Sequence, residues 1–408
     1  MSATAEQRST TEPPPHAASG LDEPENPLAR LTPQQLDELG REFDAIHDDV
    51  YAELGERDAR YIRSTIKLHR QLVLGSRLLL LGSRKRPLWL AGTAALSLAK
   101  ILENMEIGHN VMHGQWDWMN DPDINSRNWD WDTASPADAW RHSHNYEHHT
   151  FTNIRGKDRD LGYEIMRIDP HQKWHPIYLL QPLYNLLLMG FFEWGVAVHD
   201  LNRGAIHSGE KSKEQVVKEL KAIGVKARRQ IVKDYLAFPA LSSAVSGALA
   251  ARRDRRAGVD AARETFAATA KANFTANIVR NVWAYSIIFC GHFPDQTYTF
   301  SQREVAEETR GGWYVRQLLG AANIEGSAPF HFLSGNLSFQ VEHHLFPDMP
   351  SSRYAEIAPR VRDVCQRYGL PYNTGPFSKQ LGSVHRTILR LAFPGGRVRP
   401  KPAAYAGD

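Results

Sequence analysis

Three short histidine clusters, far apart in the chain, constrain the fold more than any other feature. They are His109-Asn-Val-Met-His113, His144-Asn-Tyr-Glu-His148-His149 and Gln340-Val-Glu-His343-His344, and they hold seven of the chain's 18 histidines. Imidazole is the commonest neutral metal ligand in proteins. The pattern therefore predicts a fold that brings the three segments together around a metal centre.

The spacing within the clusters suits shared metal ions. His109/His113 and His144/His148 are four residues apart, so on an α-helix each pair lies on one face. His149 should point about 100° away from His148. Seven imidazoles exceed the three protein ligands of a typical catalytic zinc. We therefore expect two metal ions. Nitrogen donors favour iron over magnesium or calcium and leave zinc, copper and nickel open.

Composition excludes several other classes of protein. The chain is 42% apolar and 23% charged, and its net charge of +3 is too small to indicate a nucleic-acid binder. Two cysteines, Cys290 and Cys365, cannot build an iron–sulfur cluster or a disulfide framework. The start, MSATAEQRST, lacks the basic region and apolar run of a secretory signal. Any membrane association must come from internal segments.

Four apolar stretches are candidates for membrane-spanning helices: Leu72–Gly82, Leu88–Leu102, Ile177–Val198 and Phe274–Phe293. A single metal site requires all three histidine clusters on one side of the bilayer. An even number of crossings must therefore separate them, and the last two stretches supply two. A crossing at Leu236–Ala251 would break the site, so we interpret that segment as non-spanning.

The rest of the chain divides by composition. Thr32 is a predicted N-cap, followed by proline at the first helical position. Leu36, Leu39, Phe43, Ile46 and Val50 then form one apolar face, which suits either a membrane surface or packing on the protein itself. We predict a disordered tail over residues 1–30, a helical segment over 31–70, the main domain over 71–393 and a flexible tail over 394–408.

Basic residues gather in two places, Lys211 to Lys233 and Arg252 to Arg256. Such runs are usually a solvated cytoplasmic face. They also suit contact with lipid headgroups or with the phosphates of an acyl-CoA. Both interpretations stay open at the level of sequence.

The segments HNVMHG, HNYEHHTFTN and QVEHHLFPDMP resemble the three histidine boxes of the membrane fatty-acid desaturases in order, spacing and flanking residues. The resemblance runs from about Tyr61 to Leu391. Segments such as ENMEIGHNVMHGQWDWMNDP and NVWAYSIIFCGHFPD are most similar to actinobacterial acyl-CoA desaturases of the stearoyl-CoA Δ9 or linoleoyl-CoA type.

This resemblance implies an all-α integral membrane protein, with a bundle of about four spans under a cytosolic helical cap that holds a diiron site. The seven box histidines would be ligands. Family sites also use a histidine from the membrane segment before the last box, for which His292 is the candidate; the alternative is an ordinary histidine at a helix end. Gln340 stands where many members have the first histidine of the last box. It could bind metal through its carbonyl or through a water.

The implied reaction introduces a cis double bond into a long-chain acyl-CoA or another acyl lipid, with two iron ions and dioxygen. Stearoyl-CoA Δ9 desaturation is favoured, but Gln340 is typical of front-end (linoleoyl-CoA type) desaturases. No His-Pro-Gly-Gly haem motif is present, so a separate NAD(P)H reductase or a ferredoxin would supply electrons. The expected location is the bacterial inner membrane, with the site on the cytoplasmic side. A diiron lipid hydroxylase, a zinc-dependent lipid hydrolase and a non-catalytic metal- or lipid-binding protein are the rivals.

Other polar residues have weaker assignments. Carboxylates near the boxes could orient imidazole N–H groups or be ordinary charges on helix faces. Asp158 and Asp160 could close a loop over the site, and His142 should face away. The candidate orienting carboxylates are Glu103, Glu106 and Glu193, and the tryptophans expected to line the site, to sit at the bilayer interface or to pack in the core are Trp116, Trp118, Trp129 and Trp131.

Overall fold

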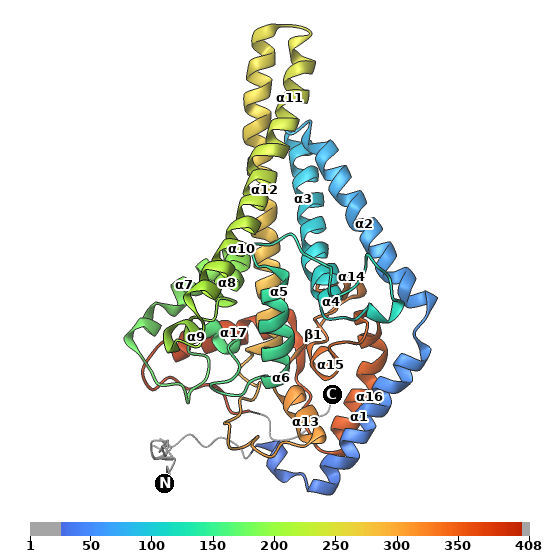
Figure 1. The fold of residues 1–408 in the computed structure, drawn as a ribbon, viewed down its shortest axis with the longest axis vertical. Coiled ribbons are helices and arrows are strands. Elements are labelled where there is room, and N and C mark those ends of the chain that lie inside the picture. The colour runs from blue at the N-terminus through green and yellow to red at the C-terminus, as the bar shows by residue number, and fades with distance from the viewer. Residues whose placement is uncertain (1–25, 402–408) are drawn as a thin grey trace, which may run out of the picture.

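Helices form most of the described chain, as a broad base from which two helical hairpins rise (Figure 1). The computed structural model describes residues 26–401, so most of the predicted tail over 1–30 lies outside the described residues. The helices are α1 (Pro33–Glu53), α2 (Glu56–Leu80), α3 (Arg86–Leu102), α4 (Asn110–Met112), α5 (Ala137–Trp140), α6 (His149–Phe151), α7 (Gln181–Gly190), α8 (Phe192–His199), α9 (Arg203–Ser208), α10 (Lys213–Ile231), α11 (Phe238–Ala251), α12 (Arg255–His292), α13 (Arg310–Leu319), α14 (Ala328–Leu333), α15 (Gln340–Leu345), α16 (Tyr354–Arg367) and α17 (Phe377–Leu391). Strands β1 (Asn323–Glu325) and β2 (Thr374–Pro376) pair in parallel. A mostly helical fold is thus confirmed.

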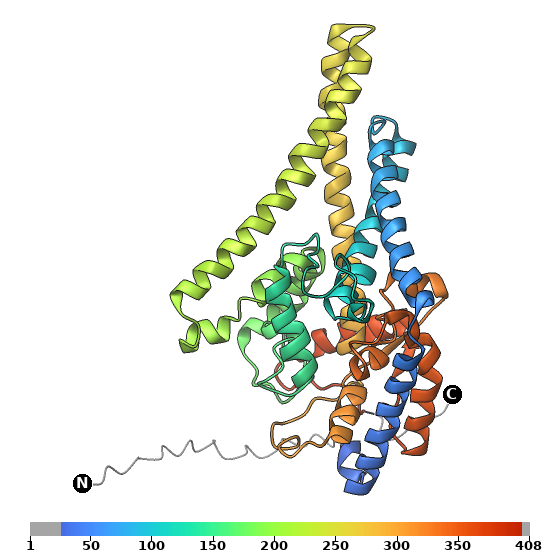
Figure 2. The same cartoon turned by 45° about the vertical axis from the view of Figure 1, so that its right-hand side comes forward.

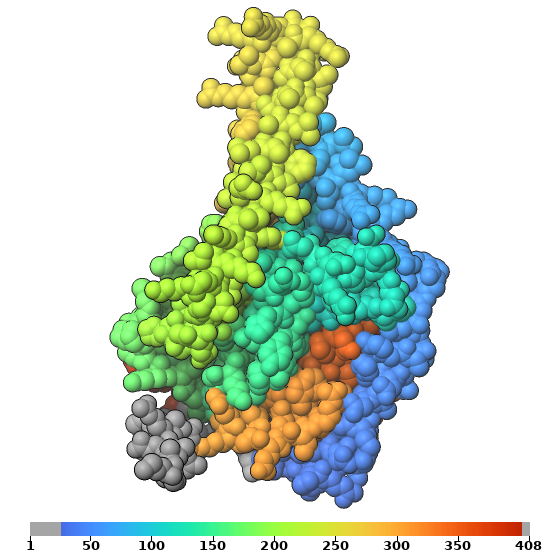
Figure 3. All heavy atoms as spheres, viewed as in Figure 1, coloured from blue at the N-terminus to red at the C-terminus, as the bar shows by residue number. Residues whose placement is uncertain are grey.

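The two hairpins are α2 with α3 and α11 with α12, and α12 also packs on α3. Both point away from the base on the same side, and the α11–α12 hairpin extends furthest (Figures 2 and 3). Small residues let its helices approach closely. A Cβ atom on Gly258 would lie 2.6 Å from the Cβ of Ala251, closer than two carbon atoms can pack. Glycine is therefore required at this crossing.

The structure corrects one prediction about the apolar stretches. Ile177–Val198, expected to be one crossing helix, is instead a 3-10 turn (Pro176–Leu180) followed by α7 and α8. The backbone leaves the helical region at Phe191, with φ −121° and ψ 35°, and α7 has only 10 residues. That is about 15 Å of helix, half the thickness of a bilayer core. Conversely, most of Leu236–Ala251 forms α11, the hairpin partner of α12.

Because α11 and α12 run in opposite directions, the chain leaves the base and returns to it between the second and third histidine clusters. The even number of passages is therefore supplied by α11 and α12, and not by the predicted pair Ile177–Val198 and Phe274–Phe293. No helix in residues 26–401 combines the length and the apolar character needed to cross a membrane.

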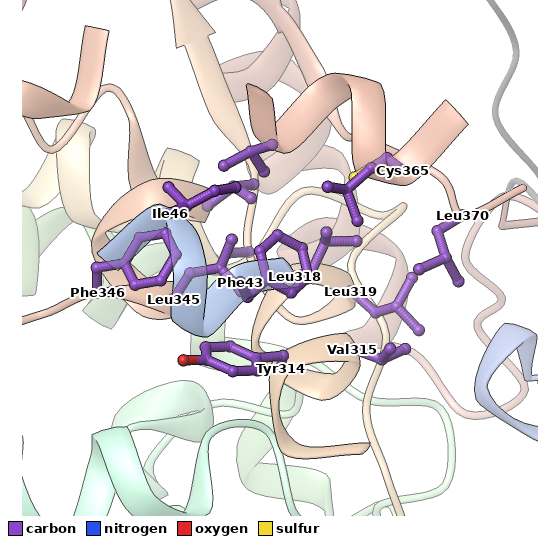
Figure 4. Close-up of a cluster of buried hydrophobic side chains, with 14 of the residues drawn as sticks. Phe43, Ile46, Tyr314, Val315, Leu318, Leu319, Leu345, Phe346, Cys365 and Leu370 are labelled. Atoms are coloured by element: carbon purple, nitrogen blue, oxygen red, sulfur yellow. The ribbon is translucent and has the colours of Figure 1, made fainter. Parts of the chain in front are cut away.

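The apolar face of α1 packs on the protein itself. Leu39, Phe43, Ile46 and Val50 are buried against α13, α15 and α16 in the cluster shown in Figure 4. The predicted N-cap is confirmed, since Thr32 accepts a hydrogen bond from the Gln35 backbone, and the Gln35 side chain caps Thr32 in return. This cluster fixes α15, which carries the third histidine box, against the rest of the base.

At the other end of the chain, residues 394–401 of the predicted flexible tail lie against the base. Arg399 forms an ion pair with the buried Asp295, at 2.6 Å.

Candidate metal centre

A π-helical turn leads into the first histidine box, and a second π-helical turn carries most of the second box. The first follows α3 as the π-helical segment Glu103–His109, and the second is Arg141–His148. Single π-helical turns are rare and occur frequently at functional sites. The α-helical geometry assumed for the second box was therefore wrong in detail, whereas the backbone N–H of His113 donates to the carbonyl of His109 as in an α-helix. The paired rings still lie side by side, with centroids 4.5 Å apart for His109 and His113.

The three boxes converge, with His292, into two groups. The ring nitrogens of His109, His113, His144 and His343 lie within 4.8 Å of one another, and so do those of His148, His292 and His344. His149 lies between the groups, with its ring centroid 4.8 Å from that of His113 and 4.6 Å from that of His344. Adjacent histidines of a tandem pair therefore lie in different places. His343 belongs to the first group and His344 to the second.

The ring nitrogens that face inward have no protein partner. The Nε2 atoms of His113, His144, His148, His343 and His344 are buried without a hydrogen bond, and both ring nitrogens of His149 are in the same state. A buried unsatisfied polar group is costly, so such a concentration requires an explanation. Two metal ions within the two groups would satisfy these atoms. The residues present therefore fit a dimetal centre, and the ligand role of each histidine stays a prediction.

Burial keeps most of these imidazoles neutral, which is the state that binds a metal. It lowers the pKa of His109 to about 3, and those of His113 and His343 well below the usual histidine range. At His148 burial acts in the same direction, but the carboxylates of Asp158 and Asp160 outweigh it and raise the pKa.

The opposite nitrogen, Nδ1, is held by a hydrogen bond in several of the rings. His148 Nδ1 lies 3.1 Å from both carboxylate oxygens of Asp158. His344 Nδ1 lies 2.9 Å from Gln317 Oε1. His343 Nδ1 lies 3.2 Å from the hydroxyl of Tyr354, which itself donates to a backbone carbonyl and can therefore accept. Donation from Nδ1 leaves the lone pair on Nε2 and aims the ring inward.

The residues that hold the imidazoles differ from those that the sequence suggested. Glu103 accepts the backbone N–H of Asp132, Glu106 accepts from Tyr61, Ser351 and Asn336, and Glu193 pairs with Arg280. Within the described residues, none of the three makes a hydrogen bond to a box histidine, so the interpretation of these residues as orienting carboxylates was wrong.

Asp158 and Asp160, expected to close a loop, instead bind the histidines directly. Asp160 lies 3.4 Å from His144 Nδ1 and 2.8 Å from His199 Nε2. Their position nine and eleven residues after the end of box two was the only sequence signal for them. His199, Gln317 and Tyr354 had no such signal, because only the tertiary fold brings them to the site.

His292 and Gln340 contact each other. Gln340 Nε2 lies 3.1 Å from His292 Nε2, and the Gln340 amide oxygen has no hydrogen-bond partner. A Cβ atom on Gly291 would lie 2.7 Å from Gln340 Cγ, so glycine makes room for the glutamine. His292 belongs to the second group by position, while metal binding by Gln340 stays a prediction.

An apolar chamber lies against the first group. Histidines 109, 144 and 292 line it with polar side chains that include Asp160, Glu193 and Asp200, but most of its exposed surface is apolar. The apolar lining includes Met105, Trp131, Trp140, Phe192, Val196 and Ile288. Trp140 stacks on His144 at 4.6 Å. Of the four tryptophans considered from sequence, Trp131 lines the chamber, whereas Trp116 is fully buried in a separate core cluster. His142 faces away, as predicted, with its side chain 67% exposed. The chamber suits an alkyl chain placed beside the metals.

Comparison with known proteins agrees with this geometry. The fatty acid desaturase family model matches residues 87–376. The chain belongs to the fatty acid desaturase family. It is 47% identical over 372 residues to an NADPH-dependent stearoyl-CoA 9-desaturase of Mycobacterium tuberculosis, which covers 91% of this chain and 83% of that protein.

More distant relatives belong to the same family. The chain is 26% identical over 312 residues to the sn-1 linoleoyl-lipid 6-desaturase of a Synechocystis strain, covering 74% of this desaturase and 80% of the relative. It is 33% identical over 113 residues to human fatty acid desaturase 3, which covers 28% and 24% of the two chains. No solved structure matches this desaturase.

One buried carboxyl near the first box should make stability depend on pH. Burial raises the pKa of Glu106 from 4.5 to about 8. Between these values the folded state keeps a proton that the unfolded state has lost, so stability falls as pH rises, by up to about 1.4 kcal/mol per pH unit. We expect Glu106→Gln to flatten the decline of the unfolding temperature between pH 5 and 8. Glu264→Gln, at a side chain that is 58% exposed, is the control and should leave the slope unchanged.

Proposed function

We propose that this desaturase introduces a cis double bond into a long-chain acyl-CoA, with stearoyl-CoA desaturated at Δ9. The observation that carries the proposal is the convergence of two histidine groups, with unpartnered Nε2 atoms, beside an apolar chamber. The relative from Mycobacterium tuberculosis, a stearoyl-CoA 9-desaturase by name, supports the acyl carrier and the position.

Two iron ions would be held in this proposal by His109, His113, His144 and His343 on one side and by His148, His292 and His344 on the other, with His149 between them. When bound, the iron pair and dioxygen supply the oxidising power that removes two hydrogens from the chain. The protein's own residues hold the imidazole tautomers through Asp158, Gln317 and Tyr354. The tryptophan-lined chamber positions the alkyl chain and excludes water.

Electrons would come from a separate NADPH-dependent reductase or a ferredoxin. The name of the mycobacterial relative supports NADPH as their source.

We further propose that the protein is held in the bacterial inner membrane, with the histidines on the cytoplasmic side. Large apolar side chains exposed on the hairpins and on α7 support this: Leu74, Leu78, Leu183, Leu187 and Leu241 are each more than half exposed. Such a surface is unusual unless lipid or a partner covers it.

Expression in a desaturase-deficient bacterium, together with a reductase, tests the function. Gas chromatography of the fatty acids should show a new cis-9 octadecenoic acid, and the His148→Ala variant should show none. A product with added oxygen would identify a hydroxylase instead. A double bond at Δ6 would favour the front-end alternative, to which the Synechocystis relative and Gln340 point. About one zinc and no iron in active protein would refute the proposal in favour of a zinc hydrolase.

A further inference from the structure

A second, polar cleft of ≈ 550 Å³ opens beside the metal-centre chamber. It lies between α2, the loop over residues 128–133 and the helix that runs from α10 into residue 233. Its charged lining consists of Arg70, Lys226, Arg229 and Lys233, together with Glu103, Asp130 and Asp132. This is the basic region that the sequence left open between a solvated face and a phosphate contact.

The charges of the cleft are not equally available to a ligand. Lys226 pairs with Asp130 at 2.6 Å, and Lys233 pairs with Asp132. Arg70 and Arg229, in contrast, are exposed and make no ion pair or side-chain hydrogen bond with any residue of the described chain. The paired lysines and aspartates nearly neutralise each other, and the third carboxylate, Glu103, is occupied by the backbone N–H of Asp132. The two unpaired arginines therefore give the cleft its capacity for an anion.

The cleft and the chamber share a wall. Trp131 and Thr133 line both of them. Trp131 packs on Trp140 at 5.0 Å between ring centroids, and Trp140 stacks on His144. The cationic cleft thus lies next to the apolar chamber, and Trp131 and Thr133 separate the two. The arrangement complements an amphiphile that has an anionic head and a long alkyl chain.

We propose that this cleft binds the phosphates of a CoA thioester through Arg70 and Arg229, while the acyl chain passes Trp131 and Thr133 into the chamber. The inference rests on the proposed acyl-CoA desaturation and adds the site of the head group. Guanidinium groups match phosphate geometry and bind it through paired hydrogen bonds. A phospholipid head offers the same chemistry with fewer phosphates, so the test separates the two sources.

The test compares Arg229→Glu with Arg228→Glu in the full-length enzyme with its reductase. Arg228 is the neighbouring residue on α10, equally exposed, and does not line the cleft. We expect Arg229→Glu to raise the KM for stearoyl-CoA about tenfold and to change kcat less than about twofold, because a repulsive charge replaces a phosphate contact. Calorimetric titration with free CoA should show the same loss of affinity without any turnover. Arg228→Glu should behave as the unmodified enzyme.

Several outcomes would overturn the inference. Equal effects of the two substitutions, or none from either, would remove Arg229 from the binding site. A loss of binding to phosphatidylglycerol vesicles with unchanged binding of CoA would assign the cleft to membrane lipid instead. The proposed function fails separately: it fails if the unmodified enzyme makes no desaturated product, even where CoA binding depends on Arg229. If product forms and the KM of Arg229→Glu is unchanged, only the cleft assignment fails.

Discussion

Replacing His149 by alanine should abolish desaturation and lower the occupancy of both metal positions at once. His149 is 4% exposed, and neither of its ring nitrogens has a hydrogen-bond partner. Its ring lies against His113 of one group and His344 of the other. Loss of a residue that merely orients a ligand costs 10- to 100-fold, so loss of a ligand between two metals should cost at least about 100-fold in activity. Elemental analysis of the purified variant should show fewer than one metal ion per chain.

His142→Ala is the matched control, since His142 lies on the π-helical segment that leads directly into His149. Its exposed ring lies 3.4 Å from Glu147 and belongs to neither histidine group. This variant should keep its metal content and its activity. A His149→Ala enzyme that still holds two metals would contradict a position between them, and one that loses a single metal would assign His149 to one group alone.

The sequence allowed us to predict that the three histidine boxes meet, because seven imidazoles can share metal ions only when the fold brings them together. The side chains that hydrogen-bond to the rings could not be predicted. Gln317 and Tyr354 lie on α13 and α16, which reach the site only when the base is packed around α1. Their side chains are common in helices and carry no local signal. The π-helical turns were also hidden, since histidine spacing alone does not reveal an inserted residue.

For a similar reason, the sequence did not reveal that α11, and not Ile177–Val198, is the helix that pairs with α12. Residues 177–198 are rich in leucine, so their hydropathy predicted a long buried or spanning helix, yet Phe191 interrupts them. The segment that forms α11 is also apolar, but it is short, and it was interpreted as non-spanning only from the number of crossings that the histidine clusters require. Gly247 of α11 and Gly258 of α12 let the two helices lie directly against each other. Packing geometry therefore decided the architecture where average hydropathy did not.

Arg316→Met should destabilise the base by about 3 kcal/mol, because it removes a fully buried guanidinium from its ion pair with the largely buried Glu308. Arg316 is 0% exposed, and its Nε and Nη2 atoms donate to the carboxylate of Glu308 at 2.6 and 2.8 Å. The same guanidinium donates to the carbonyls of Thr150 and Thr152, just beyond the second histidine box. Methionine fills a similar volume but leaves Glu308 and both carbonyls without partners.

The effect should appear as a lower thermal unfolding midpoint, together with weaker metal retention during dialysis against a chelator, because the carbonyls that Arg316 holds anchor the end of box two. Arg310→Met, on the same helix, is the control. Its side chain is 60% exposed and its ion pair with Asp44 spans 3.3 Å, so its loss should cost no more than about 1 kcal/mol. Equal destabilisation by the two substitutions would show that α13 supports the site through its apolar face alone, and that the buried guanidinium contributes nothing specific to box two.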